Sequence, residues 1–221
     1  MGGPLGGLIQ AISARDAASA LAYASVIAVI LLVAFPLHEL AHALVADYFG
    51  DPTPRLAGRI TLNPIKHLSL MGSIFFLVFG FGWATTPINP YNFRGDYRMK
   101  HAAVAIAGPL MNIAVALVFT LIYHLAALLL NPASGLFTVV GMTCGLAVQI
   151  NLFLAFFNLI PLPPLDGGTV LMAFAPENIR SLMAQIGQYG FIVVLLLSQL
   201  GLIRTLVTVP ASQLAQFLLA L

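Results

Sequence analysis

The chain has 221 residues, of which 60% are hydrophobic and only 7% are charged. An ordinary soluble domain carries about 25% charged residues, so the composition excludes a soluble cytosolic enzyme, and the high hydrophobicity excludes a disordered chain. The formal net charge of +2 is too small to indicate a nucleic-acid partner. The single cysteine, Cys144, excludes a disulfide framework and a cysteine-based metal site. The composition predicts a membrane protein whose surroundings are the lipid bilayer.

Four apolar stretches are long enough to cross a bilayer as helices, which takes about 20 residues each. They are 17–49, 101–130, 136–160 and 183–209. We expect Pro210 to end the fourth span and the residues after it to form a short amphipathic tail on the membrane surface. The sequence thus predicts an all-α polytopic membrane protein. Its single domain, 1–221, has a core at about 20–175 and an extra span and tail at 183–221.

A fifth apolar stretch, 68–84, is shorter and is interrupted by glycines. Lysine and arginine concentrate in cytoplasmic loops. If 68–84 does not cross the membrane, the basic residues of 50–100 and Arg180 share one side, and only Arg15 and Arg204 lie opposite. A full crossing would nearly abolish this asymmetry. We therefore expect a re-entrant or partly inserted segment that leaves both termini outside and the basic loops in the cytoplasm.

The segment between the first span and this stretch is rich in proline, which excludes a helix running through it. Within 55–62, the residues Arg59-Ile60-Thr61-Leu62 alternate between polar and apolar. This alternation predicts a short β-like segment on the cytoplasmic side. Such a strand could pair with an extended substrate, or the segment could be a plain turn, and the sequence favours neither interpretation.

The strongest chemical signal is His38-Glu39-Leu40-Ala41-His42, close to the end of the first apolar helix. Residues four apart lie on one face of a helix, so two imidazoles can bind one zinc ion while the intervening glutamate activates water. Ionisable residues within a membrane segment are energetically costly and are usually functional. The pattern therefore indicates a zinc site rather than a chance spacing.

Catalytic zinc usually takes three protein ligands, and Asp166 is the strongest candidate for the third. It follows Asn158-Leu159-Ile160-Pro161-Leu162-Pro163-Pro164-Leu165 and precedes Gly167-Gly168. Irregular backbone near membrane depth is tolerated where it is buried in protein or lines a cavity, so a carboxylate there is well placed to meet a metal held by another helix. The remaining single histidines are expected to be interfacial or packing residues: His67, His101 and His124.

These two motifs resemble those of the site-2 proteases, the intramembrane zinc metalloproteases of peptidase family M50. The stretch Ala107-Gly108-Pro109-Leu110-Met111-Asn112 resembles the middle core-helix motif of that family. The resemblance implies that one Zn²⁺ per chain is bound by three residues: His38, His42 and Asp166. It also implies that Glu39 is the catalytic base.

By the same resemblance, Asn112 and Asn158 lie near the active site, and we expect them to bind substrate. The implied substrates are transmembrane proteins, cut within the bilayer of a prokaryotic cell membrane, with the active site toward the cytoplasmic side. The sequence has no segment long or polar enough for a PDZ or CBS domain, which is typical of a short prokaryotic branch of the family.

Two other interpretations remain open. A membrane zinc peptidase that cuts outside the bilayer would commonly use a downstream glutamate as third ligand, and Glu177 is the only one in the sequence. Alternatively, the chain could be a zinc-binding membrane scaffold or transporter without hydrolytic activity. A transporter would be expected to show repeated halves, which are not visible, and an inactive scaffold would not require Glu39.

Overall fold

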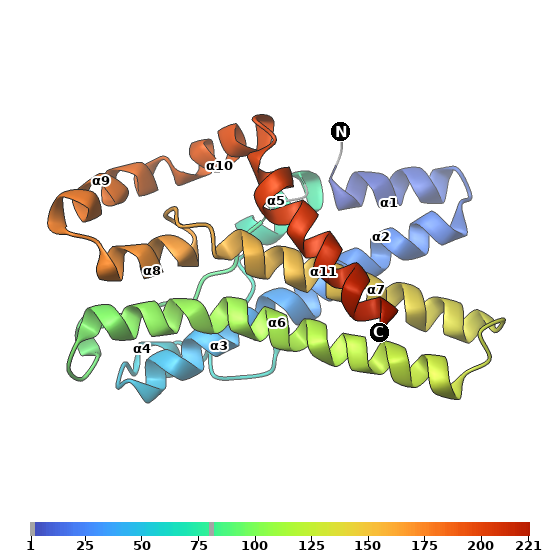
Figure 1. The fold of residues 1–221 in the computed structure, drawn as a ribbon, viewed down its shortest axis with the longest axis horizontal. Coiled ribbons are helices and arrows are strands. Elements are labelled where there is room, and N and C mark those ends of the chain that lie inside the picture. The colour runs from blue at the N-terminus through green and yellow to red at the C-terminus, as the bar shows by residue number, and fades with distance from the viewer. Residues whose placement is uncertain (1–2, 80–81) are drawn as a thin grey trace.

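The computed structural model describes residues 3–79 and 82–221, and all of their longer regular elements are helices (Figure 1). In chain order they are α1 (Pro4–Ser13), α2 (Ala17–Val29), α3 (Phe35–Tyr48), α4 (Thr53–Leu56), α5 (Leu70–Phe79), α6 (Tyr97–Leu129), α7 (Gly135–Asn158), α8 (Asp166–Phe174), α9 (Glu177–Gln188), α10 (Gly190–Gln199) and α11 (Val209–Ala220). The all-α fold predicted from the sequence is therefore confirmed.

Among the described residues, three helices are long and apolar enough to cross a membrane: Ala17–Tyr48, Tyr97–Leu129 and Gly135–Asn158. The first joins α2 and α3 into one continuous helix. Helix α6 packs against both α3 and α7 and runs antiparallel to them (Figure 1). Because α2–α3 and α7 run in the same direction, the residues at their C-terminal ends lie at the same end of the bundle.

The predicted fourth span, 183–209, is wrong as a single helix. Helices α9 and α10 meet at a bend of 85°. They form a fourth membrane span only if the two bent helices together make one crossing. The chain turns again at Gly201, whose φ of 74° suits a residue without a side chain. The surface tail expected after Pro210 is also wrong: α11 packs along α7, and its Ala211 and Ala215 are buried in a core with Val148.

Two of the prolines that lie within continuous helices follow a wide π-helical turn. Pro36 is the second residue of α3, after the π turn Ile30–Ala34, and Pro210 is the second residue of α11, after the π turn Arg204–Thr208. A proline ring clashes with the carbonyl four residues earlier in a regular α-helix. The extra residue of a π turn relieves this clash, so neither proline ends its helix.

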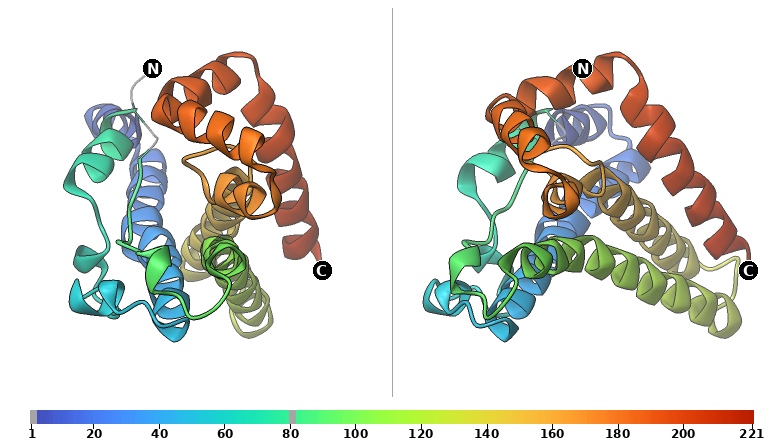
Figure 2. Two further views of the ribbon diagram at one scale, coloured as in Figure 1. Left: turned by 90° about the vertical axis from the view of Figure 1, so that its left-hand side faces the viewer. Right: turned by 60° about the vertical axis from the view of Figure 1, so that its left-hand side comes forward.

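The stretch 68–84 begins and ends at the same side of the helix bundle. Its helix α5 has ten residues, about half the number needed to span a bilayer. An antiparallel bridge joins Leu68 to Ala84, so the two ends of the stretch lie side by side. A Cβ on Gly72 would clash with the backbone of Trp83, so this close approach requires glycine. The shape agrees with the predicted re-entrant segment, visible as the teal hairpin in Figure 2.

The β-like segment predicted over 55–62 is not confirmed, and the chain there takes the turn that the sequence had left open. The chain there forms the single helical turn α4, then a turn at Gly58 with φ of 68°, followed by bends. Helix α4 forms because proline is favoured in the first turn of a helix, and both Pro52 and Pro54 lie at its start. The alternating residues 59–62 lie beyond α4, and within the described residues they pair with no strand.

Asp51 ties the end of α3 to the loop that leads into α6. The residue is completely buried. Its carboxylate accepts hydrogen bonds from the backbone N–H and hydroxyl of Thr53 (3.1 and 2.6 Å), the N–H of Asn89 (2.7 Å) and Nδ2 of Asn92 (2.8 Å). Burial alone would raise the pKa of Asp51, but the hydrogen bonds outweigh it and lower that pKa. The charged carboxylate therefore stabilises this corner of the fold.

We expect Asp51→Asn to lower the free energy of unfolding by about 1–3 kcal/mol at neutral pH, because an amide leaves buried donors without an acceptor. The lowered pKa means that the stabilisation is complete above the unfolded-state pKa, about 3.9 for aspartate. It is lost as the pH falls through the folded-state value. Thermal unfolding in detergent at several pH values measures the difference from wild type. Asp16→Asn, at the exposed cap of α2, is the control, and an equal loss in both variants would contradict the prediction.

Candidate metal centre

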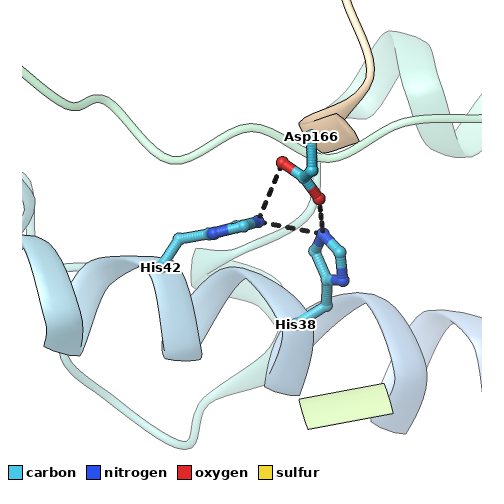
Figure 3. A group of neighbouring side chains, drawn as sticks. All are labelled: His38, His42 and Asp166. Atoms are coloured by element: carbon cyan, nitrogen blue, oxygen red, sulfur yellow. Dashed lines mark hydrogen bonds and ion pairs between the residues drawn. The ribbon is translucent and has the colours of Figure 1, made fainter. Parts of the chain in front are cut away.

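Three ligand-bearing side chains from two helices converge at one point (Figure 3). His38 and His42 lie one turn apart on α3, and Asp166 is the first residue of α8. The two Nε2 atoms are 3.0 Å apart, and they lie 3.3 Å (His38) and 3.5 Å (His42) from the oxygens of Asp166. Ligands of tetrahedral zinc, each about 2.0–2.2 Å from the ion, are about 3.3 Å from one another. The group therefore has the spacing to hold one metal ion.

The outer nitrogens of both rings face hydrogen-bond acceptors. Nδ1 of His38 is 2.6 Å from Oδ1 of Asn112, and Nδ1 of His42 is 2.7 Å from the carbonyl of Val104. The amide of Asn112 is oriented by its Nδ2, which donates to Asn151 at 3.0 Å. Each neutral ring therefore carries its proton on Nδ1 and directs the lone pair of Nε2 inward. This is the tautomer that a metal ligand needs.

Asp166 completes a set of electron-rich atoms with no proton among them. Its Oδ2 is buried and has no hydrogen-bond donor within the described part of the chain. Two lone pairs and a carboxylate facing one another at about 3 Å repel each other unless a cation lies between them. The donor set, two imidazoles and one carboxylate, is one that zinc uses in catalytic sites. These residues therefore fit a bound zinc ion.

The broken turn after α7 delivers Asp166 to the histidines. The chain leaves the helix at Leu159, and α8 begins at Asp166, so the carboxylate lies at a helix N-terminus, where negative charge is favoured. A Cβ at Gly167 would clash with the carbonyl oxygens of Leu159 and Ile160. The glycine after Asp166 thus lets α8 pack tightly against the turn.

Gly108 allows the backbone of α6 to lie against the histidine pair. A Cβ at this position would clash with Nε2 of both His38 and His42. In the sequence, Gly108 stands out only as part of the stretch Ala107–Asn112. Its function is steric, since any larger residue would occupy the space of the imidazoles.

Glu39 is buried and reaches the same site from α3. The hydroxyl of Thr86 lies 2.7 Å from Oε2 of Glu39 and 3.0 Å from its backbone carbonyl. Thr86 belongs to an extended stretch that crosses the site after the re-entrant segment. The sequence contained no signal for this contact, because residues 47 apart in sequence are joined only by the tertiary fold.

A cavity of about 690 Å³ opens onto these groups. It is lined by His38, Glu39, His42 and Asp166, and its remaining walls are mostly apolar, with Phe35, Phe75, Trp83, Leu154, Phe157 and Leu165 among them. The cavity can therefore accept an apolar peptide next to the histidines, the glutamate and the carboxylate.

The two asparagines take different positions. Asn158 lines the cavity, and its Nδ2 donates to the carbonyl of Leu154 at 3.0 Å. Asn112 is completely buried behind His38 and is not among the residues that line the cavity. Its contact with the outer nitrogen of His38 favours a role in orienting that ring over the substrate contact expected from the sequence.

The single histidines also separate into two groups. His67 bonds to the carbonyl of Thr61 at 2.8 Å and His124 to the carbonyl of Leu218 at 2.9 Å, which is the packing role expected for them. His101 instead lines the cavity, and sequence spacing alone could not show this.

Comparison with known proteins assigns the chain to a family. The sequence model of peptidase family M50 matches residues 26–140 and 131–200. The chain belongs to peptidase family M50, the site-2 proteases. It is therefore a zinc-dependent metalloendopeptidase, as the sequence motifs implied.

The chain is also similar to individual proteins. YwhC of Bacillus subtilis, named as a zinc metalloprotease, is 44% identical over 169 residues, which are 76% of this chain and 77% of the relative. Rip2 of Mycolicibacterium smegmatis, also named as a zinc metalloprotease, is 31% identical over 83% of this chain and 71% of its own length. A solved structure, the site-2 protease from Methanocaldococcus jannaschii, is 20% identical with a TM-score of 0.43, over 98% of this chain and 82% of that one.

We expect Gly108→Ala to reduce bound zinc to substoichiometric levels, because the added methyl group displaces both imidazoles. Elemental analysis of the purified protein measures the zinc content. The matched control is Gly141→Ala in α7, where a Cβ would lie 3.6 Å from Cε2 of Tyr123, an ordinary contact. A zinc content that is equally reduced in both variants, or unchanged in both, would contradict the steric role of Gly108.

We expect Asn112→Leu to weaken zinc binding about 10–100-fold, the usual effect of losing the hydrogen-bond partner of a metal-bound histidine. Without an acceptor at Nδ1, His38 can place its proton on Nε2, where it blocks the metal. Asn112→Asp keeps an acceptor and should restore much of the affinity. Competition with a chelator measures the Kd. Thr120→Val, which removes a buried hydroxyl of α6 bonded to its own helix, serves as the control and should bind zinc as wild type does.

Proposed function

We propose that the chain hydrolyses peptide bonds of transmembrane proteins within the bilayer. One observation carries the proposal: the metal-binding group and Glu39 face an apolar cavity at the ends of two membrane-spanning helices. Apolar walls suit the side chains of a transmembrane substrate and exclude bulk water from the site. A soluble peptide would have little reason to enter a cavity enclosed by spans.

His38, His42 and Asp166 are the proposed zinc ligands, and zinc bound there would polarise the scissile carbonyl and make water more acidic. Glu39 is the proposed base. Its buried carboxylate accepts the proton of the attacking water and returns it to the leaving amine. The hydroxyl of Thr86 donates to one oxygen of Glu39, which leaves the other oxygen for the water.

Asn158 is the proposed substrate contact. A helical substrate engages its carbonyls in its own hydrogen bonds, so it must unwind before attack. Asn158 lines the cavity beside the broken turn that carries Asp166. Its amide can donate to a carbonyl and accept from an N–H, so it can bind the backbone of an unwound peptide.

The distribution of charge supports a site on the cytoplasmic side. Helix α4, the start of α6 and α9 lie at the same end of the bundle (Figure 1). They carry or adjoin most of the arginines and lysines, and loops of this kind face the cytoplasm. Since the sequence relatives named above come from Bacillus subtilis and Mycolicibacterium smegmatis, we infer location in a prokaryotic cell membrane, with 1–221 acting as a single protease domain.

The alternative functions have less support. A peptidase that cuts outside the bilayer would need Glu177 as its third zinc ligand. Glu177 is exposed and pairs with Arg180 rather than with the histidines. A scaffold or transporter that only binds zinc would not need a buried glutamate directed into the cavity with a hydroxyl donating to it.

The test is Glu39→Gln. We expect the rate of cleavage to fall by about 10²- to 10⁴-fold, because glutamine cannot accept the proton, while zinc content stays near wild type. The measurement is cleavage of a single-span model protein by purified enzyme in bicelles, with zinc determined on the same sample. Asp47→Asn is the control, since this acidic residue lies on the same helix and pairs with Arg55 outside the cavity. Wild-type activity in Glu39→Gln would remove Glu39 from the mechanism.

A further inference from the structure

A second cavity, of about 350 Å³, lies between the first turns of α6 and the helices α8 and α9. His101 and Thr169 line both this cavity and the catalytic one, so the two adjoin. Apart from the apolar Met172, Ala173 and Ala184, the residues that line only the second cavity are polar. They are Tyr97, Arg98, Arg180 and Ser181, with Glu177 as the one acidic group. We call it the arginine pocket.

The guanidinium groups of the arginine pocket keep free hydrogen-bonding capacity. Arg98 donates from Nε to the hydroxyl of Tyr97 at 3.3 Å, and within the described residues it forms no ion pair. Arg180 pairs with the exposed carboxylate of Glu177, but its buried Nε has no acceptor in the described part of the chain. Two arginines against one glutamate leave the pocket with a net positive charge.

Guanidinium groups bind carboxylates through paired, charge-assisted hydrogen bonds. Glu177 shows that a carboxylate reaches Arg180 from the rim of the pocket. Because the pocket shares His101 and Thr169 with the catalytic cavity, an anion that belongs to the bound peptide can occupy it. A lipid headgroup would bind there without any peptide in the catalytic cavity.

The spacing of the two cavities limits where that anion lies in the peptide. His101 and Gly108 are seven residues apart on nearly the same face of α6, which is about 10 Å along a helix. Gly108 touches the histidine pair, and His101 marks the entrance to the arginine pocket. An extended peptide advances about 3.3 Å per residue, so about three residues separate the scissile bond from this entrance.

We propose that the arginine pocket is a specificity subsite that binds an aspartate or glutamate side chain of the substrate about three to five residues from the scissile bond. The inference rests on the proposed function, in that it assumes a peptide in the catalytic cavity. It adds a substrate class: membrane proteins with an acidic residue in the flank beside the cut segment. Arg98 and Arg180 bind the carboxylate, and Ser181 and Tyr97 supply further hydroxyl groups.

Binding can be measured without hydrolysis. The probe is a fluorescent single-span peptide in bicelles, with one glutamate moved residue by residue through the flank, and a glutamine peptide for each position. Glu39→Gln enzyme is titrated with each peptide. We expect glutamate at one or two neighbouring positions to bind about tenfold more tightly than glutamine there, the effect of a well-formed charge-assisted contact.

Arginine variants, made in the Glu39→Gln enzyme, then show which residues produce the preference for glutamate peptides. Arg98→Gln and Arg180→Gln should each reduce the preference, and the double variant should abolish it while glutamine peptides bind as before. Arg204→Gln removes an exposed arginine that does not line the pocket and should keep the full preference. Arg98→Glu should favour a lysine peptide at the same position, which shows that the variant is folded.

Cleavage by the wild-type enzyme separates this inference from the proposed function. Preferential binding of glutamate peptides without cleavage of any peptide would refute the protease function and leave the arginine pocket standing. Cleavage with equal rates and equal binding for glutamate and glutamine at every position would overturn the subsite. So would a preference that survives in the Arg98→Gln/Arg180→Gln double variant.

Discussion

The structure depends on the convergence of two imidazole lone pairs and a carboxylate at one buried point. Such atoms repel each other in a medium of low dielectric unless a cation lies among them. The surrounding residues fix this arrangement: Asn112 and the carbonyl of Val104 hold the outer ring nitrogens, and Gly108 gives the rings room. Metal binding therefore stabilises a set of contacts that would otherwise be unfavourable.

The bilayer explains why so few charged residues are present and where they lie. An ionisable group within a span is retained only where it is paired or functional. Glu39 and the two histidines satisfy this condition together at the catalytic cavity, where Asp166 joins them from α8. Asp51, just beyond the first span, is buried but accepts four hydrogen bonds. Arginines collect at one end of the bundle, where they can face water and the polar flank of a substrate.

Several features follow from contacts that local sequence patterns do not encode. The alternation at 59–62 indicated a strand, but these residues have no partner strand in the described part of the chain. Pro210 was expected to end a helix, but a π turn before it relieved the clash and the helix continued along α7. Asn112 was expected to touch substrate, whereas its place on α6 sets it behind His38.

The sequence by itself determined the membrane class and the helical fold, and it predicted the His38, Glu39 and His42 motif, because composition, helical periodicity and ligand spacing are local properties of the chain. Asp166 was predicted from its broken turn and from the family resemblance, and the tertiary structure brings it to the two histidines. Only the tertiary structure decided what surrounds these residues. The contact of Thr86 with Glu39, the steric role of Gly108 and the juxtaposition of Arg98 with Arg180 all join segments far apart in sequence. Such contacts depend on how helices pack and turn, and a single residue in a π turn changes which face of a helix meets its neighbour.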